Sequence, residues 1–210
     1  MSAAAPGLFA MFVKLAGRNC VVIGGGDVAE SKAQSLLAAG AKVTVISPDL
    51  TSRLAHKQRL GAIRWCARTF EPCDLEGAFL AIAATSDDAV NELVYRECER
   101  RGILCNVVDQ PPRCHFYFPA LVQRGDLQIA ISTAGKSPSL AQRLRKEMEK
   151  QFGPEYRDWL MWLGEVRKAL MTRRLSFERR RRLLALLVRQ ESFEHWREMV
   201  RDERALTEAA

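Results

Sequence analysis

The chain has 210 residues, of which 48% are hydrophobic and 27% are charged, a composition typical of a globular protein with a buried core. No stretch approaches the roughly 18 uninterrupted apolar residues of a membrane-spanning helix, so we expect no membrane partner. The six cysteines form no CxxC pair, which argues against a disulfide framework or structural zinc and favours a cytoplasmic location: Cys20, Cys66, Cys73, Cys98, Cys105 and Cys114.

The net charge of +7 lies mostly in the second half of the chain. Residues 1–113 have a charge balance of +1, whereas residues 114–210 have a balance of +6. This excess indicates that the second half faces an anion, although a solvated helical surface explains any single charge more simply. Nucleic-acid binding through the arginine-rich stretch 173–182 is a weaker alternative, because no aromatic platform or known reading motif accompanies it. We therefore expect no nucleic-acid partner.

The first half alternates between short apolar runs and amphipathic segments. We expect strands at residues 20–23, 43–46, 63–66, 79–84 and 104–108, and helices at residues 28–39, 49–60 and 87–101. Glycines follow the three predicted helices, as is typical of helix ends. Repeated strand–helix–strand order with short links predicts an α/β fold with a Rossmann-type doubly wound parallel sheet over residues 1–113.

The pattern changes after Pro111-Pro112, which interrupts the chain. Residues 115–122 and 127–132 predict a β-hairpin, and Ser137-Pro138 predicts the N-cap and first position of a long helix. From about residue 153 the sequence is helical and rich in arginine. A hairpin with amphipathic helices is too small to bury its own surface, so we predict a homodimer. We expect a dimerisation segment at 114–150 and an all-helical domain at 151–210.

A glycine-rich motif follows the first predicted strand directly. Gly24-Gly25-Gly26-Asp27-Val28-Ala29 fits the pattern G-x-G-x-x-A. In this pattern the first glycine permits a tight turn, the second lets the backbone approach a pyrophosphate, and the alanine allows close packing of helix on strand. Its position at a strand-to-helix junction is the required context. The motif therefore predicts a bound dinucleotide held by Gly24 to Val28, in preference to a glycine-rich turn without a ligand.

The end of the second strand favours NAD over NADP. A ribose-binding acid is expected there, about 20 residues after the glycines. The chain has Ser47-Pro48-Asp49 at this place, so either the Asp49 carboxylate or the Ser47 hydroxyl can bond the ribose. No arginine stands at the strand end to neutralise a 2′-phosphate, since Arg53 lies a turn further along.

Three segments together resemble a known family. They are IGGGDVAESKAQSLLAAGAKVTVISP, LAIAATSDDAVNELV and CNVVDQPPRCHFYFPALVQRGDLQIAISTAGKSPSLAQRLRKEME. The chain is similar over residues 8–150 to the precorrin-2 dehydrogenase family, the amino-terminal module of siroheme synthase. The resemblance implies NAD-dependent oxidation of precorrin-2 to sirohydrochlorin and a strand-exchanging homodimer. Some members also insert ferrous iron into sirohydrochlorin, which would make iron a second substrate. The sequence ends at Ala210 without a methyltransferase module, so we expect another enzyme to supply precorrin-2.

The resemblance also implies roles for individual residues. NAD contacts are expected at the glycine turn, at Pro48-Asp49 and near Thr85, and Asp109 is expected to be the catalytic acid–base residue. Residues 132–137 are expected beside the tetrapyrrole. At two positions, His115 and Thr133, the chain differs from the family, in which serine is common.

Elementary chemistry agrees with a base at Asp109. The oxidation transfers a hydride and releases a proton, and Asp109 follows the fifth strand, at the edge where such sheets hold ligands. The alternative role is to cap the turn before Pro111. We predict no resident metal, although Asp109 can contact iron during chelation.

The loop before the long helix predicts a cradle for substrate carboxylates. It combines Thr133, Gly135, Lys136 and Ser137, that is, backbone N–H groups, a helix N-terminus and a lysine. His115 is a further substrate-site candidate, with a packed strand histidine as its alternative. An NAD-binding redox-responsive regulator without catalysis is the alternative for the whole chain.

Overall fold

The computed structural model describes residues 7–208, so the outermost residues of the expected first and last domains lie outside the described part. The chain divides into two compact units, Met1–Phe118 and Pro119–Ala210. In the described part of the chain, no helix has the length and apolar character needed to span a bilayer.

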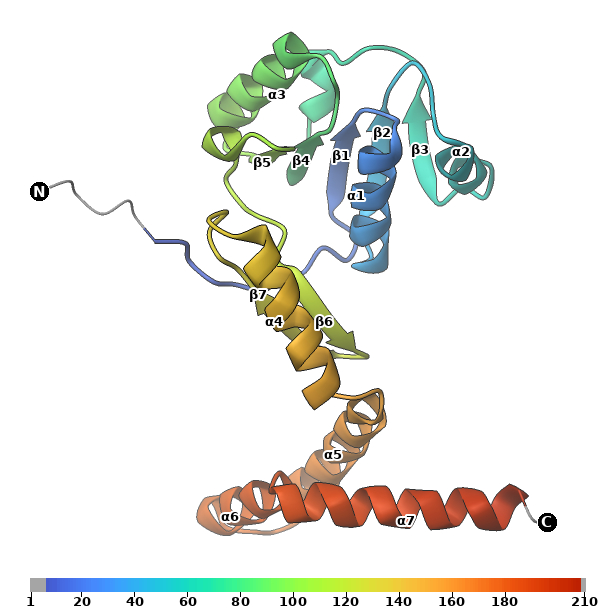
Figure 1. Cartoon of the computed structure of the whole chain (residues 1–210), viewed down its shortest axis with the longest axis vertical. Helices are drawn as coiled ribbons and strands as arrows, with labels where there is room; N and C mark the ends of the chain where they lie inside the picture. Colours follow the sequence, from blue (N-terminus) through green and yellow to red (C-terminus); the bar gives the residue numbers. More distant parts are fainter. Residues whose placement is uncertain (1–6, 209–210) are drawn as a thin grey trace, which may run out of the picture. The chain divides into compact units, whose positions relative to one another are not determined.

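The first unit is built on a five-stranded parallel sheet with the strand order β3-β2-β1-β4-β5 (Figure 1). This topology confirms the predicted Rossmann-type fold. Three α-helices and the short 3₁₀ helix η1 connect the strands, and a second 3₁₀ helix, η2, follows β5. The elements are β1 (Asn19–Ile23), α1 (Asp27–Ala38), β2 (Lys42–Ile46), α2 (Ser52–Arg59), β3 (Ile63–Cys66), η1 (Pro72–Leu75), β4 (Leu80–Ala83), α3 (Asp88–Arg101), β5 (Leu104–Val107) and η2 (Pro111–Arg113).

Both faces of this sheet are buried. Along β1, Cys20 and Val22 join a cluster with α1 and α2, whereas Val21 and Ile23 join a second cluster with α3 and η1. Because successive side chains of a strand point to opposite faces, a sheet covered on both sides needs apolar residues at every position. This requirement explains the continuous apolar runs in the sequence.

Side-chain caps set the starts of two helices. The Thr51 hydroxyl accepts the Leu54 N–H, so α2 begins at Ser52, three residues later than expected. The Asp87 carboxylate caps α3, and Gly102, at φ 66°, ends that helix as expected.

The chain after η2 stays attached to the sheet. Asn106 and Cys114 form an antiparallel bridge, and the His115 N–H donates to the Cys105 carbonyl at 2.8 Å. The prediction of a hairpin strand from residue 115 is therefore wrong over residues 115–119. The hairpin begins only after Pro119, which has no N–H to contribute to a ladder.

The second unit contains the hairpin and four helices. β6 (Ala120–Arg124) and β7 (Leu127–Ile131) pair antiparallel around a turn in which Gly125 has φ 60°. α4 (Pro138–Gln151) begins with Ser137 as its N-cap and Pro138 in its first turn, which confirms the prediction. The remaining helices are α5 (Glu155–Thr172), α6 (Phe177–Leu187) and α7 (Gln190–Glu208).

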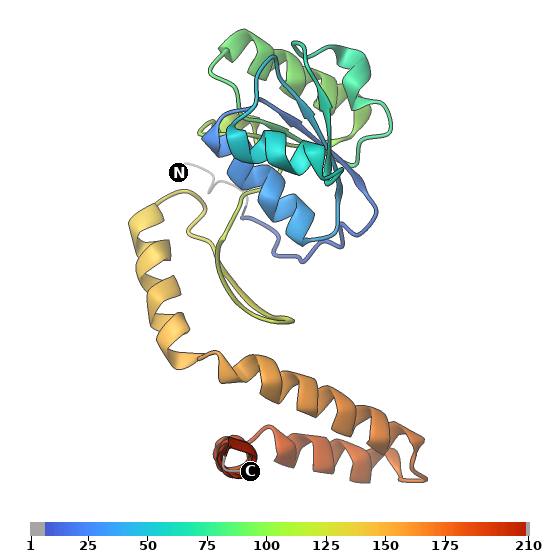
Figure 2. The same ribbon diagram turned by 90° about the vertical axis from the view of Figure 1, so that its right-hand side faces the viewer.

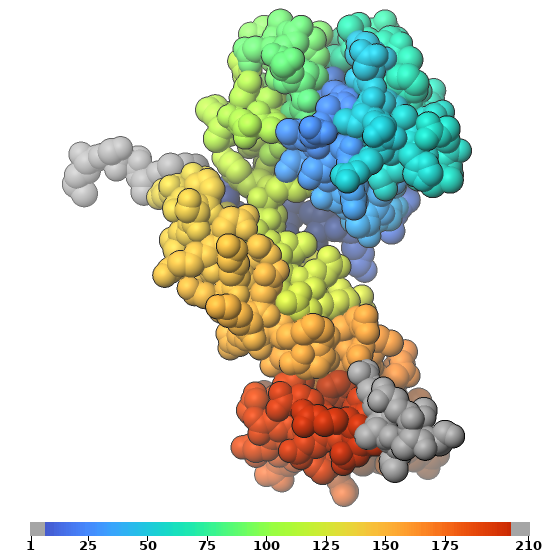
Figure 3. Space-filling view, turned by 45° about the vertical axis from the view of Figure 1, so that its right-hand side comes forward, coloured from blue at the N-terminus to red at the C-terminus, as the bar shows by residue number. Residues whose placement is uncertain are grey.

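The last three helices of the second unit pack around a small aromatic cluster. α5 and α6 run side by side and α7 crosses them (Figure 2), and the space-filling view shows α7 in red against α5 in orange (Figure 3). The rings of Tyr156, Trp159 and Phe193 lie 4.8–5.6 Å apart between α5 and α7. Among the described side chains of this unit, the buried apolar ones are Val122, Ala141, Phe193 and Trp196.

Candidate functional site

The glycine turn between β1 and α1 is shaped by close backbone contacts. A Cβ at Gly24, where φ is +117°, would lie 2.3 Å from the Ala84 carbonyl oxygen, and a Cβ at Gly25 would lie 1.9 Å from the Asp49 carbonyl oxygen. A Cβ at Gly26 would meet no protein atom within 4 Å. The fold itself therefore requires glycine at the first two positions, whereas the space beside Gly26 is open for a ligand.

The N-terminus of α1 faces this open space. No side chain caps α1 at Gly26, in contrast to α2 and α3 with their threonine and aspartate caps. Its first N–H groups are therefore available for an anion, with the positive end of the helix dipole behind them. Asp27 and Val28 are exposed in the first turn, and buried Ala29 packs against the sheet.

The two ribose candidates after β2 have different surroundings. The Ser47 hydroxyl is buried and donates to the Asp49 carbonyl at 2.5 Å, while the Ser47 carbonyl accepts the Trp65 indole N–H at 2.9 Å. Pro48 and Asp49 are exposed. Of the two alternatives, the geometry favours the Asp49 carboxylate as the group free to bond a ribose.

Glu30 is a buried contact that the sequence did not reveal. Its carboxylate accepts the Thr51 hydroxyl at 2.6 Å and pairs with Arg53 at 3.3 Å. It thereby ties α1 to the start of α2 and holds the loop that carries Asp49. Arg53, the nearest arginine to the end of β2, is thus paired with a carboxylate of the protein.

The loop after β4 carries Thr85 and lies next to the glycine turn. The Thr85 hydroxyl lies 3.0 Å from Asn91 Oδ1 and accepts the Asp87 N–H at 3.1 Å. The side-chain amide of Asn91, which is buried, donates to the Thr85 carbonyl at 3.0 Å. The contact of Gly24 with Ala84 places the glycine turn and the Thr85 loop side by side.

Asp109 lies directly after β5 at the same edge of the sheet. Its φ is +59°, a left-handed conformation that costs a non-glycine residue about 1 kcal/mol, although aspartate tolerates it better than most residues. The turn is closed by the Gln110 N–H, which donates to the Val107 carbonyl at 3.2 Å. Within residues 7–208 the exposed Asp109 carboxylate accepts no hydrogen bond. The turn-capping alternative therefore has no contact to support it.

Lys32 brings a cation from α1 to the same region. Its ammonium lies 3.8 Å from the centre of the Phe118 ring, within the range of a cation–π contact. Burial lowers the pKa of Lys32, and the attraction of Asp109 acts in the opposite direction. No local pattern singles out this lysine, because its neighbours Asp109 and Phe118 lie 77 and 86 positions away in the chain.

His115 is occupied by contacts with β5 and α3. Its Nδ1 accepts the Cys105 N–H at 3.0 Å, and its Nε2 contacts the Glu99 carboxylate. The two ring nitrogens thus fasten the segment after η2 to β5 and to α3. These contacts favour the packed-histidine alternative over a role in the substrate site.

The loop before α4 is internally bonded. Thr133 accepts the Ser137 N–H through its hydroxyl and the Lys136 N–H through its carbonyl, and the Ser132 hydroxyl accepts the Ala134 N–H. Three of the N–H groups expected to cradle a carboxylate are therefore taken. Exposed Lys136 is the charged group that this loop offers to an anion.

In the described part of the chain, no three His, Cys, Asp or Glu side chains are grouped so that they could hold a metal ion.

The residues predicted to contact the cofactor lie with Asp109 at one edge of the sheet of the first unit. Thr133 to Ser137, predicted to contact the substrate, belong to the second unit.

Comparison with known proteins covers both units. A family model described as "Putative NAD(P)-binding" matches residues 11–120, and one described as "Sirohaem biosynthesis protein central" matches residues 124–151. The siroheme synthase of Methylobacillus flagellatus is 43% identical over 171 residues, which are 81% of this chain and 37% of that protein. The siroheme synthase of Actinobacillus pleuropneumoniae is 37% identical over 201 residues, which are 95% of this chain and 41% of that protein. The chain thus spans about two fifths of the length of these relatives.

A solved structure resembles the chain over nearly its whole length. The structure of SirC, a precorrin-2 dehydrogenase, matches with a TM-score of 0.77 at 27% identity, covering 89% of this chain and 92% of that chain.

Proposed function

Since this chain belongs to the precorrin-2 dehydrogenase family, the amino-terminal module of siroheme synthase, we propose that it oxidises precorrin-2 to sirohydrochlorin with NAD. The observation that carries the proposal is the sheet edge of the first unit. There an uncapped helix N-terminus and an open space beside Gly26 follow β1, and the unbonded carboxylate of Asp109 follows β5, with β4 and its Thr85 loop between these two strands. This is the arrangement that an NAD-dependent dehydrogenase needs.

The residues divide the chemistry between them. When bound, NAD accepts a hydride from the macrocycle. The N–H groups at Gly26 to Val28 would bind the pyrophosphate, and the Thr85 loop would contact the cofactor. Asp109 removes the proton that the oxidation releases, because its carboxylate is exposed and free of competing hydrogen bonds. The Lys32 ammonium attracts the Asp109 carboxylate and the anionic substrate.

We infer that NAD is preferred over NADP. The Asp49 carboxylate can accept both ribose hydroxyls, and it would repel a 2′-phosphate. Ser47 contributes by holding the Asp49 carbonyl, and Pro48 fixes the backbone between them. Arg53, which pairs with Glu30, is less available to bind a phosphate.

The second unit is proposed to bind the substrate carboxylates and a second copy of the chain. Lys136, with the uneven +6 balance of residues 114–210, gives the tetrapyrrole a cationic surface. Thr133, Gly135 and Ser137 shape the loop that presents this lysine. We also propose that residues 114–150 form a dimerisation segment, that residues 151–210 form a helical domain and that the protein is cytoplasmic.

Ferrous iron is a proposed second substrate. Metal insertion requires the removal of pyrrole N–H protons, and Asp109 is the base available near the cofactor for this step as well. In this role the iron is a substrate that leaves the site in the product, and it is not a resident cofactor.

The test is to incubate purified protein with precorrin-2 and NAD in the absence of air and record absorbance spectra. We expect sirohydrochlorin and NADH to appear together, and siroheme to form when ferrous iron is added. NAD binding without any turnover of precorrin-2 would instead favour the redox-responsive regulator. Sirohydrochlorin that accumulates unchanged with iron would restrict the activity to the dehydrogenase step.

A further inference from the structure

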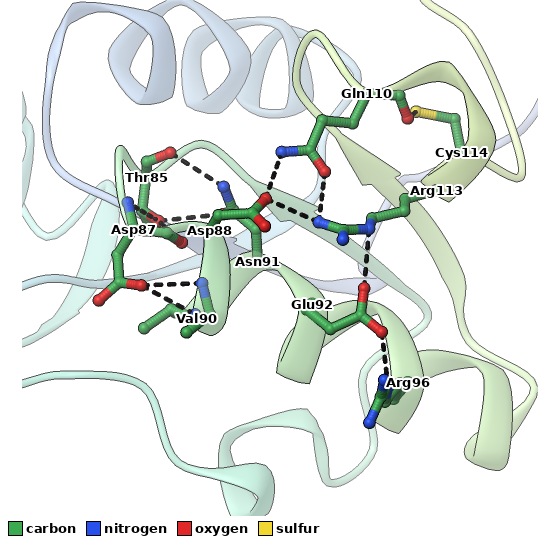
Figure 4. A network of polar contacts seen from close by, with 11 residues as sticks. Thr85, Asp87, Asp88, Val90, Asn91, Glu92, Arg96, Gln110, Arg113 and Cys114 are labelled. Carbon is green, nitrogen blue, oxygen red and sulfur yellow. Dashed lines mark hydrogen bonds and ion pairs between the residues drawn. The ribbon is translucent and has the colours of Figure 1, made fainter.

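A polar network fastens the segment after Asp109 to the start of α3 (Figure 4). Arg113 Nη1 donates to Asp88 Oδ1 at 2.7 Å and to Gln110 Oε1 at 2.6 Å, while Arg113 Nε pairs with Glu92 Oε2 at 2.7 Å. Gln110 Nε2 donates to the same Asp88 oxygen at 2.8 Å. The residue next to Asp109 and the arginine of η2 thus converge on the first two turns of one helix.

The helix start that receives these contacts also carries the Thr85 loop. Asp87 caps α3 through the N–H groups of Ala89 and Val90, and its own N–H donates to the Thr85 hydroxyl. Asp88 follows it directly. The Asp88 carboxylate binds Gln110 in the turn that carries the proposed base, and the neighbouring Asp87 binds the Thr85 loop proposed to contact the cofactor. The start of α3 therefore connects the two.

We expect the network to contribute little to the stability of α3 itself. Asp87 already satisfies the N-terminal N–H groups of that helix, and Asp88 is exposed. The Arg113 side chain, by contrast, is only 26% exposed, and its guanidinium makes three contacts in a fixed planar arrangement. The hydrogen bonds from Gln110 and Arg113 hold the pKa of Asp88 below its usual range, so the carboxylate is ionised at neutral pH.

Asp109 needs such support because its own turn is weakly held. Its backbone is left-handed and its carboxylate is exposed, and the turn is held by one 3.2 Å backbone hydrogen bond and by weak hydrogen bonds from the Cys114 thiol to the Val107 and Gln110 carbonyls. A base that shifts by about 1 Å can lose up to about a hundredfold in rate.

We propose that Arg113 is a positioning residue, which fixes the distance between Asp109 and the Thr85 loop by tying Gln110 to Asp88. This inference rests on the proposed function, in which Asp109 is the base. Arg113 touches neither substrate nor cofactor in this role and acts through the Asp109 turn.

The test compares Arg113→Met with Arg100→Met, a matched variant on α3 that removes an ion pair with Glu97 away from the site. Arg113→Met should lower kcat for precorrin-2 by about tenfold and change the KM for NAD less than twofold, because the glycine turn is intact. Arg100→Met should leave both unchanged. Arg113→Lys should restore only part of kcat, since an ammonium lacks the planar fork. Asp88→Asn, which keeps the shape of the network, should lower kcat in the same direction.

A double-mutant cycle with Asp109→Asn tests the positioning role of Arg113 separately from the role of Asp109 as the base. If Arg113 acts through Asp109, Arg113→Met should cause no further loss of kcat in the Asp109→Asn protein. Two losses that multiply, or a near-normal kcat in Arg113→Met beside a strong loss in Asp109→Asn, would overturn the positioning role and leave the base intact. Near-normal turnover by Asp109→Asn would instead overturn the proposed base.

Amide hydrogen exchange provides a readout that does not depend on activity. Arg113→Met should increase exchange over residues 108–114 while the sheet strands stay protected. Unchanged exchange in this segment would contradict the proposal, and exchange raised throughout the unit would identify Arg113 as a general stabilising residue.

Discussion

The two units of the chain differ in how they bury their apolar residues. In the first unit, helices cover both faces of the sheet, and β1 and β4 are buried at almost every position. In the second unit, the hairpin strands alternate between intermediate and exposed residues, and Val122 is the buried exception. Large apolar side chains are exposed in both units, for example Phe9 and Leu60 in the first and Leu121 and Phe177 in the second. The first unit therefore contains most of the buried core, and in the proposed homodimer a partner surface would cover apolar residues of the second unit.

The same difference extends to function. The proposed cofactor site depends on backbone packed against backbone, with Gly24 and Gly25 in contact with neighbouring loops. The features proposed to bind anions in the second unit are exposed side chains such as Lys136. We therefore expect substitutions in the first unit to act on cofactor and chemistry, and substitutions in the second to act on assembly and substrate affinity.

The largest effect is expected from Asp109→Asn. Precorrin-2 turnover should fall by roughly 10²–10⁴, the usual contribution of a positioned acid–base group, with NAD affinity unchanged. Steady-state rates and NAD titration on the same preparation check this. Loss of folding, seen as a lower Tm, would instead support a structural role for Asp109 in its turn.

The glycine turn allows a paired test of cofactor binding. Gly26→Val should weaken NAD binding by about a hundredfold, equal to about 2.7 kcal/mol, because its side chain fills the space beside the helix N-terminus. The Tm should be nearly unchanged, since a Cβ there meets no protein atom. Gly25→Val, with a Cβ 1.9 Å from the Asp49 carbonyl, should lower both affinity and Tm. Equal Tm losses in the two variants would contradict the distinction.

Oligomeric state tests the exposed surface of the second unit. Leu121→Asp on β6 should raise the dimer dissociation constant by about ten- to a hundredfold, the value of one buried leucine. Leu60→Asp introduces the same charge at an exposed leucine of the first unit and should have no effect. Sedimentation at several concentrations measures both. A fully active wild-type monomer at micromolar concentration would contradict the homodimer.

We expect kcat/KM to be about tenfold or more higher with NAD than with NADP. The reason is the exposed Asp49 carboxylate at the end of β2. Asp49→Ser should reduce this preference. Equal kcat/KM values for the two cofactors in the wild type would show that another group reads the ribose.

The smallest effect is expected from Lys32→Met. The KM for the tetrapyrrole should rise about two- to fivefold, the value of a partly exposed ion pair, whereas Lys42→Met at the opposite sheet edge should have no effect. Burial lowers the pKa of Lys32, so its charge is lost at a lower pH than that of an ordinary lysine. The KM of the wild type should therefore rise as the pH becomes alkaline, and that of Lys32→Met should depend less on pH.

The parts predicted from sequence are those governed by local rules. The buried strands, the glycine turn and the Ser137 cap each depend on residues close in the chain. The polar contacts that organise the site were not predictable in this way. Thr51 lies 21 residues from Glu30, and Arg113 lies 25 residues from Asp88. Such pairs form only when the sheet brings distant loops together.

The hairpin boundary was missed for a related reason. Residues 115–119 are apolar enough to resemble a strand, but His115 and Cys114 bond to β5 instead of the hairpin. A sequence pattern gives the tendency to be extended and does not name the partner strand.

Single-turnover kinetics test the central claim most directly. Enzyme in excess over precorrin-2 is mixed with NAD, and the absorbances of NADH and sirohydrochlorin are followed together. The account predicts that both products form at one rate and in equal amounts in the wild type, and that Asp109→Asn binds NAD but forms neither on that timescale. Sirohydrochlorin without an equal amount of NADH, or an undiminished rate in Asp109→Asn, would contradict it.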